Sequence, residues 1–199
     1  MMQISTSHQS GGGDTPVTPP TDEDNAIYSW DLTQSLVDSK TGKVISLFGA
    51  TQDSNRLHLN TANDYALIDG GLLYVSGKRV EIEFGECTDG GFDTHGRLIR
   101  FGTSADATSF DHGLCWRSTG YWSVYAGSWK TVTNQLTDKV VINNSKVTLI
   151  FNSDDTLTAK IGDVVVHDNV SCTYRYIAIG ASSQAYYNAT IKSIKVYEV

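Results

Sequence analysis

The sequence KVTLIFNSDDTLTAKIGDVVV, from Lys146 to Val166, contains three short apolar runs separated by two turn signals. The first run, Lys146–Asn152, is apolar on both faces, as in a strand in the interior of a sheet. The second run, Thr156–Ile161, alternates apolar and polar residues with the period of a half-buried strand. The Asn, Asp and Gly residues between the runs favour tight turns, so the stretch predicts consecutive antiparallel strands.

The same period of two recurs outside this stretch. KRVEIEF, residues 78–84, places three apolar side chains on one face and charged side chains on the other. GRLIRFG, residues 96–102, is a further strand-like apolar run. No window of ten or more residues has apolar side chains at the spacing of an amphipathic helix. Roughly a dozen short strands with frequent turns predict an all-β fold, a two-sheet antiparallel β-sandwich of the jelly-roll kind.

The composition excludes several classes of protein. The chain has 199 residues, 40% of them hydrophobic, and a formal net charge of −7. A nucleic-acid binder would need clustered Lys and Arg, so no nucleic-acid partner is expected. No apolar run approaches the ~20 residues that span a bilayer, so we expect no membrane span. The first ten residues lack the basic and apolar regions of a signal peptide, which predicts synthesis in the cytoplasm.

Residues 1–25 differ in composition from the rest of the chain. They contain all three prolines, a triplet of glycines, and no Lys, Arg or aromatic residue. Such a segment buries too little apolar surface to offset the entropy lost on folding. We therefore expect a flexible, extended arm or linker over residues 1–25 and one β-sandwich domain over residues 26–199.

The three cysteines, Cys87, Cys115 and Cys172, have spacings that match no zinc-binding pattern. Their odd number leaves at least one unpaired. We expect reduced thiols that act as small core residues.

Several segments, in their order along the chain, resemble the concanavalin A-like and laminin-G-like jelly rolls. Ala26–Leu32, followed by the turn at Asp38–Ser39, is similar to the opening strand and turn of that family. Tyr176–Gly180 (YIAIG) resembles its strand ending in Ile-Gly, and Ala189–Tyr197 resembles its returning C-terminal strand. The resemblance covers residues 26–199 and implies two stacked antiparallel sheets. This fold serves lectins, glycosidases, adhesion modules and virion proteins alike.

An aromatic stretch between residues 114 and 129 holds three of the four tryptophans. Strand alternation assigns to the core the side chains of Leu114, Trp116, Trp122 and Val124. The side chains of Arg117, Tyr121, Tyr125 and Trp129 are then left at the surface. Sugar rings stack on aromatic faces and form hydrogen bonds with neighbouring polar groups. The alternative is that these rings fill the sandwich or its rim. With a second aromatic loop included, the predicted glycan-binding residues are Arg117, Tyr121, Tyr125, Trp129, Tyr186 and Tyr187.

The carboxylates Glu81, Glu83 and Glu86 resemble the E-x-D-x-x-E strand of concanavalin A-like β-glucanases, with Glu in place of the middle Asp. In those retaining enzymes two carboxyl groups lie ~5 Å apart on one face. Glu86 falls on the opposite face unless Gly85 forms a β-bulge. We predict no catalytic residue and no enzymatic activity. The alternative is a β-glucanase-type glycoside hydrolase acting through Glu81 and Glu86, with Glu83 beside them.

Laminin-G-like relatives hold calcium at a loop rim through carboxylates. Asp89, Asp93 and Asp111 offer such groups here, but they match none of the known ligand positions of that family. The resemblance makes calcium a possible ligand. Because the positions do not match, no cofactor is predicted and no residue is assigned to metal binding.

These observations predict a virion-associated recognition or decoration protein without catalytic activity, carried by a bacteriophage particle. Residues 1–25 would dock on other virion proteins, and the sandwich would bind a surface glycan. The alternative is a structural capsid or tail cement protein that binds no sugar.

Overall fold

The computed structural model describes residues 25–54, 56–59, 64–88, 97–105, 112–138, 140–180 and 188–199. The regular elements in these ranges are fifteen β-strands. They are β1 (Tyr28–Asp31), β2 (Ile45–Phe48), β3 (Thr51–Gln52), β4 (Leu57–Leu59), β5 (Tyr65–Ile68), β6 (Leu73–Tyr74), β7 (Lys78–Thr88), β8 (Arg97–Gly102), β9 (His112–Arg117), β10 (Tyr121–Tyr125), β11 (Lys146–Phe151), β12 (Thr156–Ile161), β13 (Val164–Ser171), β14 (Tyr176–Gly180) and β15 (Asn188–Glu198).

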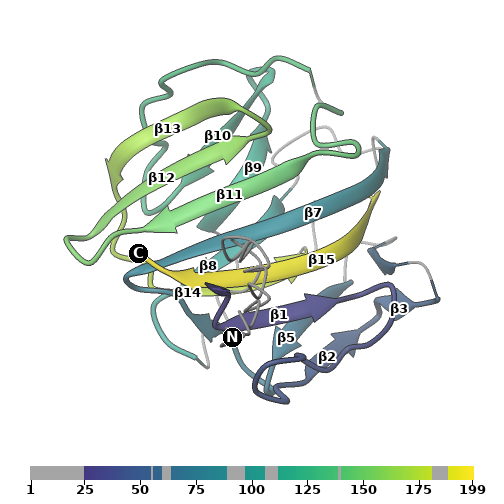
Figure 1. The fold of residues 1–199 in the computed structure, drawn as a ribbon. Helices are drawn as coiled ribbons and strands as arrows, with labels where there is room; N and C mark the ends of the chain where they lie inside the picture. The colour runs from purple at the N-terminus through teal and green to yellow at the C-terminus, as the bar shows by residue number, and fades with distance from the viewer. Residues whose placement is uncertain are drawn as a thin grey trace, which may run out of the picture.

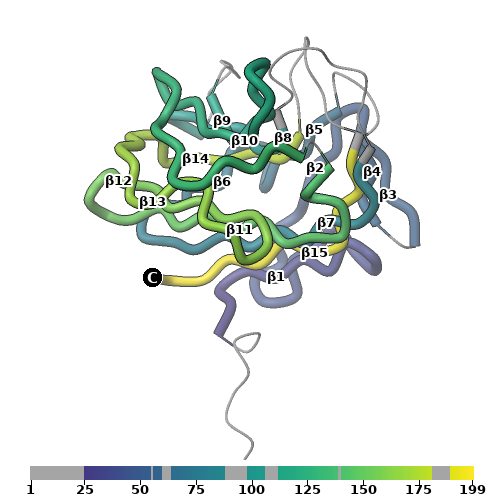
Figure 2. The backbone as a smooth tube through the Cα atoms, turned by 90° about the horizontal axis from the view of Figure 1, so that it is seen from above, coloured from purple at the N-terminus to yellow at the C-terminus, as the bar shows by residue number. Residues whose placement is uncertain are grey.

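The strands form two antiparallel sheets packed face to face (Figure 1). One sheet has eight strands in the order β13-β12-β11-β7-β15-β4-β3, with β1 also paired to β15. The other has seven strands in the order β10-β9-β8-β14-β5-β2, with β6 paired to β14. Figure 2 shows the two layers, with β11, β7, β15 and β1 on one side and β9, β8 and β5 on the other. The predicted all-β, two-sheet sandwich is confirmed.

The long strands β7 and β15 form the centre of the eight-stranded sheet. The C-terminal strand β15 returns beside the opening strand β1, with Tyr28 opposite Val196 and Trp30 opposite Ile194. The last strand thus returns to lie beside the first, in agreement with the resemblance of Ala189–Tyr197 to a returning C-terminal strand.

The core lies between the sheets and follows the period-two pattern of the sequence. On β7, Val80, Ile82 and Phe84 have no exposed surface, whereas Glu81 and Glu83 face outward. Trp30 of β1 and Trp122 of β10 are the largest fully buried side chains. Burial of this apolar surface supplies most of the stabilisation of such a fold.

A β-bulge interrupts β7 after Phe84. Phe84 is opposite Ile191, while Cys87 is opposite Ala189, so β7 has one residue more than β15 between these two pairs. All four side chains point into the core. The extra residue leaves Gly85 and Glu86 together on the outer face of the sheet.

The segment Trp129–Asp138, here called the strap, runs between the edge strands β10 and β13. The amide of Lys130 donates to the carbonyl of Val124 on β10 at 3.0 Å. The amide of Thr133 donates to the carbonyl of Val166 on β13 at 2.8 Å. The strap therefore occupies backbone groups on both sheet edges, which would otherwise be open to pairing with another chain.

The three cysteines are buried, as expected, and no disulfide joins any two of them. Burial raises the pKa of Cys87 to about 12, so its thiol stays protonated near neutral pH.

Over the described ranges, no helix has the length and apolar character needed to cross a membrane.

Candidate functional site

The aromatic stretch forms the hairpin of β9 and β10 at the edge of the seven-stranded sheet. In its register Tyr121 lies opposite Arg117, and Tyr125 lies opposite Gly113. The four side chains assigned to the core are buried there, namely Leu114, Trp116, Trp122 and Val124. The alternation of this hairpin is therefore as predicted.

Four partly exposed side chains follow one another along the hairpin and the start of the strap. This aromatic row consists of Tyr121, Arg117, Trp129 and Tyr125. The guanidinium carbon of Arg117 lies 5.4 Å from the ring centre of Tyr121 and 4.7 Å from that of Trp129. The rings of Trp129 and Tyr125 meet edge to face at 5.2 Å. The structure thus brings together four of the six predicted site residues.

Arg117 is less available to a ligand than the sequence suggested. Its guanidinium donates a hydrogen bond to the Tyr121 hydroxyl and lies over two rings. Cation–π contacts of this kind hold aromatic rings in place. Arg117 therefore orders the row as well as contributing charge to it.

His112 and Tyr174 extend the row beyond Tyr125, and neither is among the six glycan-binding residues predicted from the sequence. The His112 ring stacks on Tyr125 at 5.4 Å with an interplanar angle of 4°. The amide of Gly127 donates to Nδ1 of His112, so in a neutral ring the proton is on Nε2, which lies 2.8 Å from the Tyr174 hydroxyl. His112 is the first residue of β9, so the sheet fixes the position of this ring.

The other two predicted site residues, Tyr186 and Tyr187, lie outside the described residues. So do the three aspartates considered for calcium, Asp89, Asp93 and Asp111. Within the described part of the chain no group of three or more His, Cys, Asp or Glu side chains could hold a metal ion. Calcium stays a candidate ligand on the family resemblance alone.

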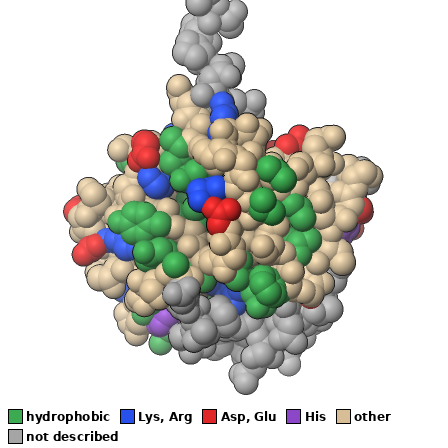
Figure 3. Space-filling view, turned by 90° about the horizontal axis from the view of Figure 1, so that it is seen from below, with side chains coloured by type: hydrophobic (Ala, Val, Ile, Leu, Met, Phe, Trp, Pro, Cys, Tyr) green, Lys and Arg blue, Asp and Glu red, His purple; other side chains and the backbone are tan. Residues whose placement is uncertain are grey.

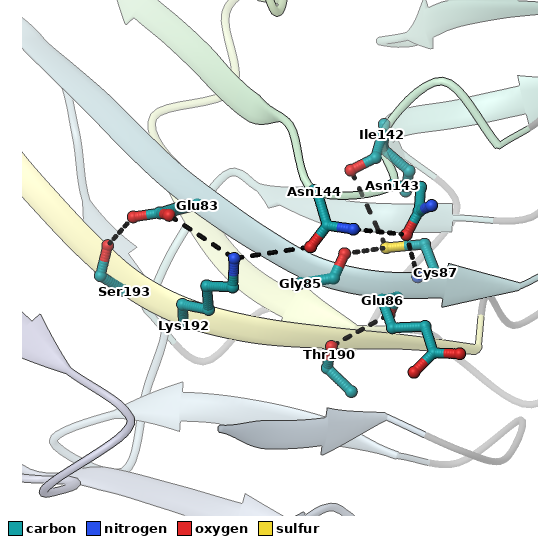
Figure 4. Close-up of polar contacts among 10 residues, drawn as sticks. All are labelled: Glu83, Gly85, Glu86, Cys87, Ile142, Asn143, Asn144, Thr190, Lys192 and Ser193. Atoms are coloured by element: carbon teal, nitrogen blue, oxygen red, sulfur yellow. Dashed lines mark hydrogen bonds and ion pairs between the residues drawn. The ribbon is translucent and has the colours of Figure 1, made fainter. Parts of the chain in front are cut away.

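The bulge changes the placement of the three glutamates on β7. The sequence left Glu86 on the opposite face from Glu81 and Glu83 unless Gly85 formed a bulge, and the bulge is present. Figure 4 shows Glu86 on the strand beside Thr190, whose hydroxyl donates to the Glu86 carbonyl at 3.0 Å. Position 85 has no space for a side chain, because a Cβ there would lie 2.6 Å from Oγ1 of Thr190.

Ion pairs and hydrogen bonds surround these glutamates. Glu81 pairs with Lys146 at 3.1 Å and with Arg79 at 3.4 Å. Glu83 lies 3.8 Å from the Lys192 ammonium and accepts a hydrogen bond from the Ser193 hydroxyl, as Figure 4 shows. Ion pairs of this kind on the outer face of a sheet contribute little to stability.

No protein-family profile matches this sequence, and no curated protein matches it either. Among solved structures, the chain is similar to Trypanosoma rangeli sialidase, with a TM-score of 0.60 and 14% identity; the match covers 92% of this chain and 33% of that chain. It is also similar to domain 4 of AbnA, a GH43 extracellular arabinanase from Geobacillus stearothermophilus, in complex with arabinotriose. That match has a TM-score of 0.53 and 10% identity and covers 87% of this chain and 92% of that chain.

These matches confirm the β-sandwich fold. The chain corresponds to about a third of the sialidase chains that it matches. Neither match supports a bacteriophage or virion assignment.

The prediction that this chain is not an enzyme is contradicted by the same matches. By name, the matched structures are sialidases and a domain of a GH43 arabinanase, so this fold also occurs in chains of glycoside hydrolases. Excluding enzymatic activity on the basis of the sequence was therefore wrong. At 10–14% identity the likeness establishes the fold and identifies no reaction.

Proposed function

We propose that this chain is a glycan-binding β-sandwich whose ligand stacks on the aromatic row. The observation that supports this proposal is the continuous series of partly exposed rings held by Arg117 and Trp129. Sugar rings present C–H bonds to aromatic faces and hydroxyls to polar groups, and the row offers both. The matched arabinanase domain, in complex with arabinotriose, is a sandwich of the same kind.

Replacing Tyr121 and Tyr125 together by alanine should weaken glycan binding by about thirtyfold, since each aromatic contact contributes about 1 kcal/mol. A glycan array probed with the full chain, with and without calcium, first identifies the ligand. Titration calorimetry with that glycan then compares native chain and double variant.

Phe48→Ala is the matched control for this experiment. Phe48 is a 40% exposed aromatic residue on β2, at the other edge of the same sheet. Its removal should leave the affinity unchanged. A folded Tyr121→Ala/Tyr125→Ala variant that binds as tightly as the native chain would show that the row is not the site.

Hydrolysis is a second candidate function, favoured by the bulge at Gly85 and Glu86. The bulge puts Glu86 on the same outer face as Glu81 and Glu83, as a retaining β-glucanase would require. We infer that Glu81 and Glu86 would then act as the two catalytic carboxyl groups.

If the chain cleaves glycans in this way, Glu86→Gln should lower reducing-sugar release from β-glucans by at least about a hundredfold, because an amide cannot transfer the required proton. Glu198→Gln is the control, since Glu198 is an exposed glutamate of the same sheet, paired with Lys78. The hydrolase proposal fails if the native chain releases no sugar, or if Glu86→Gln retains the native rate.

A role in a virion is a separate proposal, and only the composition of residues 1–25 supports it. We propose that this arm attaches the sandwich to a larger particle assembled in the cytoplasm. A cement role without sugar binding has one observation in its favour, the exposed apolar side chains of Val37 and Val44, which lie opposite each other. Attachment would be supported if a protease cleaves residues 1–25 in the isolated chain but not when the chain is bound to a particle.

A further inference from the structure

A hollow of about 470 Å³ lies at one end of the sandwich, away from the aromatic row. This end hollow is lined by Tyr28 of β1, Leu73 and Tyr74 of β6, Lys78 of β7, and the loop residues Lys43 and Asp69. Side chains from both sheets thus meet in it. Figure 3 shows the face of the molecule seen from below, where hydrophobic side chains surround adjacent Lys or Arg and Asp or Glu side chains.

Two tyrosine rings wall the end hollow, and both are held by other rings. Tyr74 is 50% exposed, and Tyr176 meets its ring edge to face at 5.2 Å. Tyr28 lies 5.7 Å from the ring of the fully buried Trp30. A half-exposed ring with a fixed orientation presents a flat apolar face to solvent at little further entropic cost.

The charged groups of the end hollow are already paired. The Lys43 ammonium binds Asp69, and the Lys78 ammonium binds Glu198 at 2.8 Å. The hydrogen bond from Lys43 lowers the pKa of Asp69, so this carboxyl is an acceptor at neutral pH. Because each positive charge has a partner, the hollow favours an uncharged ligand that both donates and accepts hydrogen bonds.

The backbone around Lys43 and Asp69 is held in place. The indole N–H of Trp30 and the amide of Asp38 both donate to the Lys43 carbonyl, at 3.0 and 2.8 Å. The amide of Val44 donates to the Asp69 carboxylate at 3.1 Å. The polar groups are therefore positioned before any ligand arrives, which lowers the entropic cost of binding.

We propose that the end hollow is a second carbohydrate site, which takes a neutral sugar. The sugar's C–H faces would pack on Tyr28 and Tyr74 over the side chain of Leu73, and vicinal hydroxyls would bind the adjacent ammonium and carboxylate of Lys43 and Asp69. This site does not depend on the aromatic row. The row lies on the β9–β10 edge of the seven-stranded sheet, whereas Tyr74 lies on β6, beyond β8 and β14.

The test is a nuclear magnetic resonance titration of the full chain with three neutral trisaccharides: maltotriose, cellotriose and arabinotriose. At least one should shift the backbone amides of residues 69–74 in a saturable way. The same titration in the Tyr121→Ala/Tyr125→Ala variant should give the same shifts. A loss of sugar binding at the aromatic row can therefore be distinguished from a loss of sugar binding at the end hollow.

Tyr74→Ala should weaken this binding by about tenfold, and Tyr74→Phe should restore most of it, because the ring supplies the stacking. Lys43→Met should also weaken it. Phe48→Ala is again the control for loss of an exposed ring.

The proposal is overturned if none of the three sugars shifts these amides at millimolar concentration. It is also overturned if an acidic trisaccharide of galacturonic acid binds there more tightly than the neutral ones. Because the native chain gives the primary result, a variant that fails to fold would not leave the question open.

Discussion

Replacing His167 by leucine should lower the free energy of unfolding by about 2–4 kcal/mol at pH 7, since buried backbone groups lose their hydrogen-bond partner. His167 lies on β13 with no exposed surface. Its Nδ1 lies 2.8 Å from the Thr131 carbonyl of the strap, and its Nε2 accepts from the Val124 amide of β10 at 2.9 Å. One neutral imidazole thus links an edge of each sheet to the strap.

The same contacts predict a dependence on pH. Burial lowers the pKa of His167 below 6.5, and protonation of Nε2 would break its bond with Val124. As the pH falls below about 6.5, the unfolded chain binds a proton on this histidine that the folded chain does not, so stability decreases. Between pH 7 and pH 5 this residue should cost the native chain at most about 2 kcal/mol, and the leucine variant should lack that loss.

Urea denaturation at pH 7, 6 and 5 measures both effects. The difference between native chain and variant should be largest at pH 7 and shrink toward pH 5. His58→Leu is the control, because His58 is partly exposed and pairs with Asp53 at the surface. A pH-independent difference between the native chain and His167→Leu would contradict the neutral, hydrogen-bonded state of this ring.

Replacing Gly113 by alanine should lower the free energy of unfolding by at least about 3 kcal/mol or prevent folding. The added methyl group would overpack the sheet, and only a shift of the backbone could relieve the clash. Gly113 has φ +153° and lies within β9, opposite Tyr125. A Cβ at this position would lie 2.0 Å from the Ile99 carbonyl oxygen and 3.2 Å from the Arg100 Cα. No rotamer change relieves a clash with the backbone of β8.

Gly120→Ala separates this clash from simple backbone strain. Gly120, in the turn between β9 and β10, has φ +90°, and nothing lies within 4 Å of a Cβ built there. Its replacement should cost only about 1 kcal/mol. Thermal and urea unfolding of the two variants gives the comparison. Equal costs would mean that β8 and β9 do not approach each other as closely at Gly113 as described.

The strands that could be predicted from the sequence are those whose signal is local. Lys146–Phe151, Thr156–Ile161 and the start of β13 lie where the alternation and the Asp and Gly turns put them. Alternation also separated the buried side chains of the β9–β10 hairpin from those of the aromatic row. Neighbours along a strand point to opposite faces whatever the rest of the fold does, so this information is contained in short windows.

The residues that these side chains contact could not be predicted from short stretches of sequence. Trp129 reaches Arg117 because the chain turns back after β10, and Tyr174 reaches His112 across 62 residues. The enzymatic assignment failed for a related reason. The face on which Glu86 lies is decided by a single extra residue in the register of β7 and β15, and no pattern in the sequence of β7 specifies that residue.

The all-β class, the strand periods and the face of each side chain within a regular strand could therefore be read from the sequence, because they follow from backbone geometry and local burial. Which of these faces meet is known only from the packing of the two sheets. The bulge that turns Glu86 outward, the link through His167 and the end hollow between Tyr28 and Tyr74 all join residues distant in the chain. Such contacts depend on strand order and register, which long-range packing selects and no local pattern encodes.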